Sequence, residues 1–318
     1  MIALIVCLGL VVVIGLVGAV VMVMVGPSSS DLATSMAAGD RIAVIAITGM
    51  IQEGEDGGSL FGAAPFSARQ VNAQIRQAGK DRSVKAVLLR INSPGGSAAA
   101  SQSIHEEVMK LRAKKKPVIV SMGDVAASGG YYIASAANTI MASPATMTGS
   151  IGVIMQSVNW SGLAAKYGVK DETVTSGPYK DTMSPFRSMR DDEREMVKAM
   201  ITEVYDQFVN DVAKGRNMKV DQVKKLADGR VYTGSQALRV GLVDKLGNFQ
   251  DAVEEAARQG KIKGEPVLKE MGRTKGLYGW LSELSSLRPA RVLPGMPDPT
   301  IGTGLWLLAQ ENQAVVAK

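Results

Sequence analysis

Two residue types that often build reactive or cross-linked sites are almost missing from this sequence. It has one cysteine, Cys7, and one histidine, His105. A single cysteine excludes a disulfide within one chain and leaves too few ligands for a zinc site of cysteines and histidines. We therefore expect no metal and no other cofactor. A Ser-His-Asp triad would have to use His105, which lies beside acidic residues in a predicted helix, as is typical of a histidine on a solvated face.

Features of a nucleic-acid-binding protein are also missing. The net charge is +6, yet most basic residues are scattered among acidic ones. The one dense basic run, residues 110–116 (KLRAKKK), ends a predicted helix just before Pro117. Cationic side chains in the last turn of a helix complement its dipole, which explains the run without a partner. Because interleaved aromatic residues and a recognised motif are missing, we expect no nucleic-acid partner.

Charged residues are absent from residues 2–25, which are almost entirely apolar. A helix needs roughly 20 apolar residues to cross a bilayer, so this segment is long enough to span it once. A cleaved signal peptide would carry a basic region and a shorter apolar core, and the bulky Val6 argues against lipid attachment at Cys7. We therefore predict a transmembrane anchor at residues 1–25, followed by a linker at residues 26–40. The charges of the linker are acidic, which slightly favours an extracytoplasmic domain.

Strands and helices alternate along the chain after the linker. Residues 41–51, 84–92 and 117–122 are rich in apolar and β-branched side chains and predict buried strands. Residues 66–79 and 97–115, which lie between them, predict helices. This alternation predicts βαβ units and an α/β fold with a mainly parallel sheet.

A long helix is predicted at residues 191–214, which acidic residues open and Lys214-Gly215 closes. Apolar residues recur on one face of this helix, which predicts a buried stripe. The stripe consists of Met196, Met200, Ile201, Val204, Phe208 and Val212. We expect a single domain over residues 41–271.

A tail is predicted at residues 272–318, where four prolines lie between residues 289 and 299. Three interpretations of this tail stay open. The simplest is a flexible extension, because prolines and glycines disfavour a packed helix. The second is an amphipathic segment at residues 277–284 that binds the bilayer or a neighbouring subunit. The third is that the apolar residues 305–309 occupy a substrate groove as a pseudo-substrate.

Two places in the sequence share one construction, a hydrophobic strand that runs into a glycine-rich turn and then a helix. They are residues 88–96 (LLRINSPGG) and residues 118–130 (VIVSMGDVAASGG). Helix starts expose unpaired N–H groups, and glycines there let a substrate backbone come close. Two such turns at the same end of adjacent parallel strands would place two N–H donors around one oxygen, as in an oxyanion hole. One glycine pair alone is more often structural, so it is the pairing that favours a site.

Ser128 stands at the second of these corners, with Gly129 after it, as nucleophilic serines often do. Serine at this position is also a good helix N-cap, and the residues alone favour that structural role. A hydroxyl nucleophile further needs a base. The residues alone do not select one base among the lysines of the chain.

Further motifs extend this pattern. In chain order they are SPGG at 93–96, DVAASGGY at 124–131, TGSIGV at 148–153, SGPYKD at 176–181 with Ser184-Pro185, GRVYTGSQAL at 229–238 and GLVD at 241–244. With these motifs the sequence resembles the signal peptide peptidases of the SppA type, short form, in the ClpP/crotonase superfamily. The resemblance covers about residues 40–265. It implies a ClpP/crotonase-like fold of repeated ββα units, preceded by one transmembrane helix.

The resemblance also implies roles for five residues. Ser128 matches the nucleophile and Lys180 the general base. Ser150 matches the serine that orients this lysine, and Gly95 matches the oxyanion-hole glycine, which works with the N–H of Gly129. In the short form the serine and the lysine belong to one domain, and the family builds ring-like homo-oligomers. To act as a base, a lysine must be uncharged at neutral pH, which requires burial among apolar groups and no carboxylate partner.

The implied activity is that of a serine endopeptidase that degrades remnant signal peptides and similar peptides at a bacterial cell membrane. Its partners would be peptide substrates, the membrane and further copies of the chain. Because a carboxylate would hold the lysine charged, Asp181 and Glu172 must point away from Lys180. Two other interpretations stay open. One is an acyl-CoA enzyme of the crotonase type, which needs no nucleophilic serine, and the other is an inactive membrane scaffold in which the turns only pack.

Overall fold

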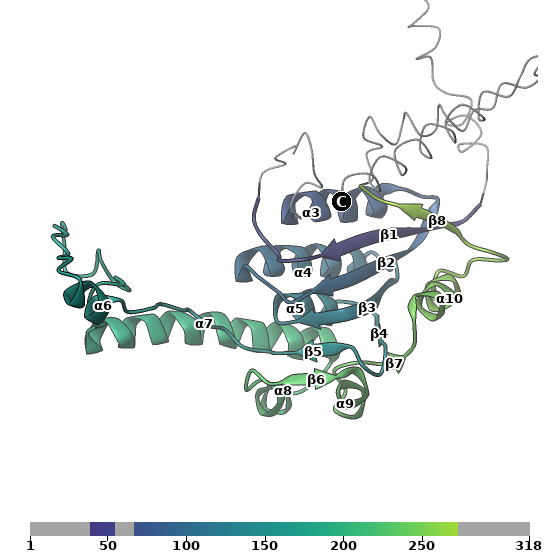
Figure 1. Ribbon diagram of the computed structural model, residues 1–318. Helices are drawn as coiled ribbons and strands as arrows, with labels where there is room; N and C mark the ends of the chain where they lie inside the picture. The colour runs from purple at the N-terminus through teal and green to yellow at the C-terminus, as the bar shows by residue number, and fades with distance from the viewer. Residues whose placement is uncertain (1–38, 55–66, 273–318) are drawn as a thin grey trace, which may run out of the picture. The chain divides into compact units, whose positions relative to one another are not determined.

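Eight strands form one sheet in the computed structural model, which describes residues 39–54 and 67–272. They are β1 (Arg41–Thr48), β2 (Val84–Ser93), β3 (Val118–Ala127), β4 (Thr139–Ala142), β5 (Met147–Gly149), β6 (Val231–Thr233), β7 (Lys245–Leu246) and β8 (Val267–Glu270). Their order is β6-β5-β3-β2-β1-β8, with β4 paired to β3 and β7 paired to β4. The pairs are parallel except for the antiparallel pair of β5 and β6. The predicted α/β fold with a mainly parallel sheet is confirmed (Figure 1).

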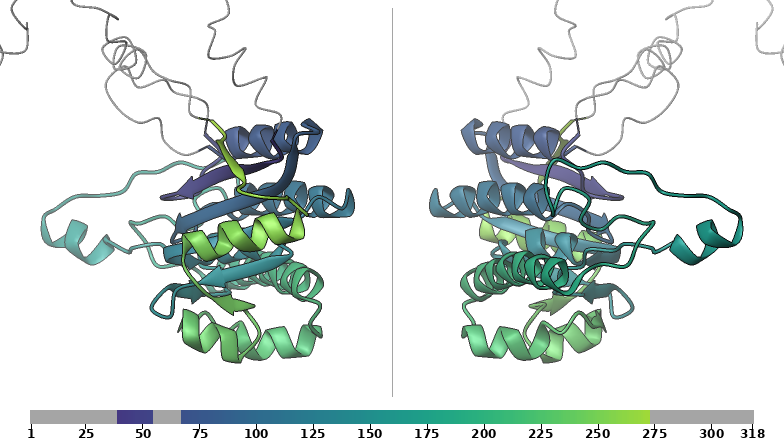
Figure 2. Two further views of the ribbon diagram at one scale, coloured as in Figure 1. Left: turned by 90° about the vertical axis from the view of Figure 1, so that its right-hand side faces the viewer. Right: turned by 90° about the vertical axis from the view of Figure 1, so that its left-hand side faces the viewer.

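Helices cover both faces of this sheet. The described helices are α3 (Ala68–Lys80), α4 (Ala98–Ala113), α5 (Gly129–Ser135), α6 (Ser161–Lys166), α7 (Asp191–Arg216), α8 (Val220–Leu226), α9 (Gly234–Arg239) and α10 (Phe249–Gln259). Helices α3, α4 and α5 pack on one face of the central strands, and α10 packs on the other face (Figure 2). The parallel strands are therefore buried on both sides, as is usual for parallel sheets.

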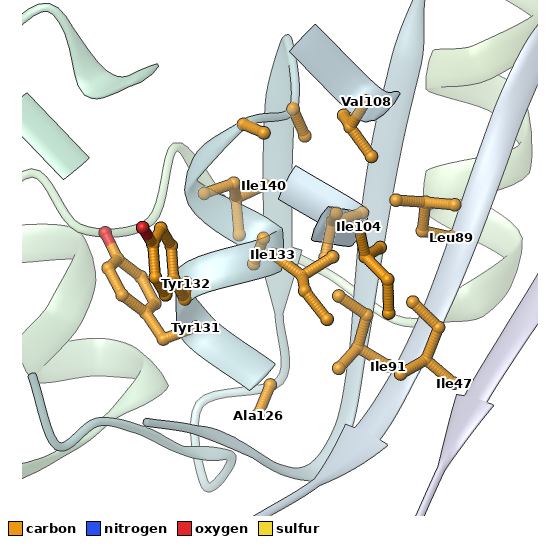
Figure 3. Close-up of a cluster of buried hydrophobic side chains, with 14 of the residues drawn as sticks. Ile47, Leu89, Ile91, Ile104, Val108, Ala126, Tyr131, Tyr132, Ile133 and Ile140 are labelled. Atoms are coloured by element: carbon orange, nitrogen blue, oxygen red, sulfur yellow. The ribbon is translucent and has the colours of Figure 1, made fainter. Parts of the chain in front are cut away.

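Successive residues of the central strands belong to two different cores. Ile47 and Leu89 pack in the core under α4, where Figure 3 shows them near Ile104. Ile42 and Leu88 belong to the core under α10. Successive side chains of a strand point to opposite faces, so a strand buried on both faces is apolar at nearly every position. This requirement explains the continuous apolar runs from which the strands were predicted.

Residues 153–190, hereafter the arm, lie outside this layered core. Figure 1 shows α6, which belongs to the arm, beyond the amino-terminal end of α7 and away from the sheet. The second half of α7 packs on the core through Phe208, Val209 and Val212, whereas Met200 in the first half is 43% exposed. The apolar stripe that the sequence predicts along this helix is therefore only partly buried within one chain.

Three predicted segments lie wholly or mostly outside the described residues. They are the anchor at residues 1–25, the linker at residues 26–40 and the tail at residues 272–318. No helix in the part of the chain that the structure describes is long and apolar enough to cross a membrane. The anchor stays a prediction from the sequence.

Candidate active site

The two glycine-rich turns lie side by side at the carboxyl edge of the sheet. Strands β2 and β3 are parallel neighbours, and Ser93 at the end of β2 is paired with Ala126 near the end of β3. At Gly95, φ is +108°, and a Cβ atom there would lie 2.8 Å from the amide nitrogen of Gly129 and 2.9 Å from Cβ of Ser128. Glycine is thus what allows the turns to approach this closely. The predicted pairing of the two turns is confirmed.

Ser128 occupies the sharp corner between β3 and α5. Its φ is +52° and its ψ is −120°, a conformation that costs a non-glycine residue on the order of 1–3 kcal/mol. Its N–H donates to the carbonyl of Gly149 at 2.8 Å, and its own carbonyl accepts from the N–H of Tyr132 at 2.8 Å. Its side chain makes no capping hydrogen bond to α5. The corner is thus fixed by backbone bonds, and the hydroxyl does not serve as the N-cap that the residues alone favoured.

A cleft of about 750 Å³ opens beside Ser128. It lies between the turn after β2, the start of α5, the segment after β5, the second half of α7 and the end of α8. Its lining residues are Pro94, Gly96, Ser97, Ala98, Ser128, Gly129, Tyr132, Ser150, Gly152, Val153, Ile154, Val204, Tyr205, Phe208, Ala227, Asp228 and Gly229. The lining carboxylate, Asp228, accepts hydrogen bonds from Arg230, which lowers the pKa of Asp228. Most of the remaining wall is backbone or apolar, which suits an extended peptide.

The backbone N–H groups of Gly129 and Gly96 are among those of this cleft that have no acceptor within the described residues. Gly129 begins α5, so its N–H has no partner within the helix, and Gly96 lies in the turn after β2. The N–H of Gly95 differs because it donates to Oγ of Ser93 at 3.1 Å. Gly95 therefore contacts Ser128, while Gly96 lines the cleft. The sequence analysis did not single out Gly96, although it belongs to the same SPGG turn.

Ser150 lines the same cleft as Ser128. It follows Gly149, whose carbonyl accepts the N–H of Ser128, and its own N–H donates to the carbonyl of Arg230 at 2.8 Å. Its φ of +48° is rare for a non-glycine residue, so this backbone is also held in a strained form. Ser128, Gly129 and Ser150 are thus brought together at one cleft, as the resemblance implies.

Lys180 is the predicted site residue that the structure does not bring to this cleft. It lies on the arm, between α6 and α7, and its side chain is exposed. It is not among the residues that line the cleft beside Ser128. The arm leaves the cleft at Val153 and runs toward the amino-terminal end of α7, beyond which α6 lies (Figure 1). Within one chain, the proposed nucleophile and the proposed base are therefore in different places.

Arg187 pairs with Asp181, which follows Lys180 in the sequence, and with Glu193 in the first turn of α7. Its guanidinium lies 2.7 Å from Asp181 and 2.6 Å from Glu193. These hydrogen bonds lower the pKa of Asp181 and hold the pKa of Glu193 at about 2. Within the described residues, neither Lys180 nor Glu172 forms an ion pair. The carboxylate of Asp181 thus points to Arg187, as a lysine base at Lys180 requires.

His105 is not on a solvated face, so that expectation was wrong. Its side chain is 3% exposed, and its ring centroid lies 5.2 Å from that of Tyr132. Flanking acids suggested exposure, but α4 turns this face toward α5 and leaves Glu106 outside. His105 does not line the cleft, and its Nε2 has no hydrogen-bond partner among the described residues. Its position supports a structural role rather than a catalytic one.

The burial of His105 predicts a loss of stability in mild acid. Burial lowers its pKa, so below about pH 6.5 the unfolded chain binds a proton that the folded chain does not. The free energy of unfolding should then decrease by up to about 1.4 kcal/mol per pH unit. Urea unfolding at about pH 7.5 and about pH 5.5 measures this loss, and His105→Phe should remove it. An equal loss in His105→Phe would assign the effect to other groups.

Comparisons with known proteins extend these observations. The sequence profile of peptidase family S49 matches residues 110–263. The putative signal peptide peptidase SppA of Enterococcus faecium is 39% identical over 247 residues, which cover 77% of this chain and 71% of that protein. Protease 4 of Salmonella typhi is 41% identical over 291 residues, which cover 89% of this chain and 46% of that protein. A solved structure of a mutant 1510-N membrane-bound stomatin-specific protease is 15% identical, with a TM-score of 0.48, and covers 74% of this chain and 99% of that chain.

Proposed function

Since this chain belongs to peptidase family S49 and is a serine peptidase, we propose that it is a membrane-anchored endopeptidase with Ser128 as nucleophile and Lys180 as general base. Its proposed substrates are remnant signal peptides and similar membrane-associated peptides, which the name of its Enterococcus faecium relative supports. The apolar residues 2–25 support a single-pass anchor in a bacterial cell membrane, with the domain on the extracytoplasmic side. A ClpP/crotonase-like fold of repeated ββα units is part of the same proposal.

The observation that carries this proposal is the position of Ser128, at a strained corner that shares a cleft with the N–H groups of Gly129 and Gly96, for which the described part of the chain offers no acceptor. Its Oγ would attack the carbonyl carbon of a peptide bond and form a tetrahedral oxyanion. We assign the N–H groups of Gly129 and Gly96 as the donors to this oxygen, because both residues line the cleft beside Ser128, while Gly95 allows the two turns to approach closely. In this geometry Gly96 takes the donor role that the resemblance gives to Gly95.

A base must remove the proton of Ser128 and pass it to the leaving amine. Water then attacks the acyl-enzyme, and the base takes a proton from this water and returns it to the serine. Burial among apolar groups favours a neutral amine over an ammonium, and a carboxylate partner opposes it. The ion pair of Asp181 with Arg187 therefore supports Lys180 in this role.

The arm supports an active site that forms between two copies of the chain. Lys180 does not line the cleft of its own chain. The arm exposes large apolar side chains, among them Val174 at 95%, Ile154 at 87% and Tyr167 at 71%. Clustered exposed apolar side chains are typical of interaction surfaces. A homo-oligomer in which the arm docks on a neighbouring copy would cover them and bring Lys180 to the Ser128 of that neighbour.

The proposed function is tested by cleavage of a signal-peptide substrate and by labelling with a fluorophosphonate. The purified full chain in detergent should cleave the peptide and carry the label on Ser128, and Ser128→Ala should lose both. Ser150→Ala should cleave more slowly because the lysine is less well oriented, yet it should still be labelled at Ser128. An acyl-CoA enzyme or an inactive scaffold would show neither cleavage nor labelling, and that result would reject the proposal.

A further inference from the structure

Six basic side chains gather at the amino-terminal edge of the sheet, opposite to the cleft. In a parallel sheet the loops that lead into the strands all lie at one edge, and here they precede β1, β2, β3 and β8. The left view of Figure 2 looks onto this side of the molecule. We call the set the basic edge; its exposed residues are Lys80, Arg82, Lys114, Lys115, Lys261 and Lys263.

The other charges of these loops are already satisfied. Lys85 pairs with Asp40 at 3.4 Å, and Lys269 pairs with Asp81 at 2.9 Å. Lys116 donates to the carbonyl groups at the end of α3. None of the six residues of the basic edge forms an ion pair with the described residues, and the remaining carboxylate of these loops is Glu265. The basic edge therefore carries a large excess of uncompensated positive charge.

These charges are close enough to act together. Neighbouring strands lie about 4.8 Å apart, so the loops before β8 and β3, three strand spacings apart, are separated by roughly 15 Å. A Cβ atom at Gly260 would lie 3.3 Å from Cβ of Lys85, which places the turn with Lys261 beside the start of β2. Burial, with the charges of Lys85 and Lys114, lowers the pKa of Lys116. Like charges within a Debye length of about 8–10 Å repel one another, so a polyanionic surface would stabilise this edge.

The point where the chain enters the domain indicates which polyanion this is. Arg41 begins β1 at the basic edge, where its N–H donates to the carbonyl of Ser83 at 2.8 Å. Residues 26–40 separate it from the apolar residues 2–25. A random-coil chain of about 15 residues spans about 20 Å on average, and an extended one at most about 50 Å. The basic edge is thus the part of the domain that is tethered nearest to the proposed anchor.

We propose that the basic edge binds the anionic headgroups of the bilayer in which the chain is anchored. This inference rests on the membrane anchoring in the proposed function. Clusters of four to eight lysines and arginines beside a membrane segment are typical of binding to anionic lipid. No aromatic residue lies in the loops of the basic edge, so they lack the stacking platforms of a nucleic-acid site.

Acetylation of lysines on the full chain in vesicles tests the proposal. The chain is reconstituted in phosphatidylcholine alone or with about one third phosphatidylglycerol, and acetylation is followed by mass spectrometry. The five lysines of the basic edge should react at least about threefold more slowly in the anionic vesicles, and about 0.5 M salt should abolish the difference. Lys170 and Lys198, which are exposed on the arm and on α7, should react equally in both.

Matched variants assign the effect to the basic edge. Lys114→Glu with Lys115→Glu should remove the protection of the other edge lysines, whereas Lys166→Glu with Lys170→Glu should keep it. Equal reactivity in the two lipids would overturn the proposal, as would protection by duplex DNA in place of the anionic lipid.

Flotation of the vesicles tests lipid binding by the basic edge separately from the membrane anchor. A chain that does not float with neutral vesicles lacks the anchor. If the same chain floats with anionic vesicles and its edge lysines are protected there, the result still supports lipid binding by the basic edge. A chain that floats with neither kind of vesicle would overturn it. Peptide cleavage in detergent, measured in parallel, reports on the peptidase function alone.

Discussion

Chains with Ser128→Ala and chains with Lys180→Ala should each be inactive, and co-expression of the two should restore activity. Each substitution should lower kcat by about 10³-fold or more, and the double mutant should be no worse, because residues that act as a unit are not additive. When the site forms between two copies, a mixed oligomer contains sites with an intact serine from one chain and an intact lysine from another. When the two chains are present in equal amounts and assemble at random, roughly a quarter of all sites have both groups intact. Peptide cleavage by the purified mixture measures the recovery.

A matched mixture controls for this recovery. Ser128→Ala co-expressed with the double mutant has no intact serine, so it should stay inactive at the same oligomer size. Absence of recovery in the first mixture, with oligomers of normal size, would place both catalytic groups on one chain. Appreciable activity in Lys180→Ala together with loss of activity in His105→Ala would support a histidine base and reject the Ser/Lys dyad.

Gly95→Ala should reduce kcat by about 100-fold or more while the chain still folds. The new Cβ would meet the amide nitrogen of Gly129 at 2.8 Å and Cβ of Ser128 at 2.9 Å, and the φ of +108° disfavours any side chain. The two turns must then separate, which moves the N–H donors away from the oxyanion. Steady-state kinetics measure kcat, and urea unfolding shows whether the fold is kept.

Gly152→Ala is the matched control, because Gly152 also lines the cleft. A Cβ there would lie 3.4 Å from Cα of Gly229, which is an ordinary contact. The kcat of the Gly152→Ala variant should differ from that of the wild type by less than about threefold. Wild-type kcat in Gly95→Ala would show that the close approach of the turns does not support catalysis.

The sheet and the nucleophile corner could be predicted from the sequence because both are determined locally. Strands buried on two faces require continuous apolar runs, and such runs are visible in single segments. The corner at Ser128 requires glycines beside it and beside the neighbouring turn, and these also appear as short motifs. That the two turns meet follows from the parallel order of β2 and β3, which the alternation of strands and helices predicts.

Other features depend on contacts that no local pattern records. The acids beside His105 predicted exposure, but the orientation of α4 is set by packing against α5, which buries the ring beside Tyr132. The stripe on α7 predicted burial along its length, yet Met200 is left exposed within one chain. The base could be chosen only through the family resemblance, because the arm around Lys180 has no regular apolar period. The proposed contact between the arm and a neighbouring copy could not be predicted either, because a single sequence does not show how two chains pack against each other.

The ten residues of β3 separate the cleft from the basic edge. At about 3.3 Å per residue, this strand would hold Ser128 roughly 30 Å above a bilayer if the basic edge binds it as proposed. That height is close to the thickness of the hydrocarbon core itself, about 30 Å. In that arrangement, a peptide still embedded in the hydrocarbon core would not reach the cleft, whereas a peptide that has dissociated from the bilayer would. Intact membrane proteins would thus be spared, and the lifetime of each remnant peptide would follow its rate of escape from the lipid, with the more apolar peptides persisting longest.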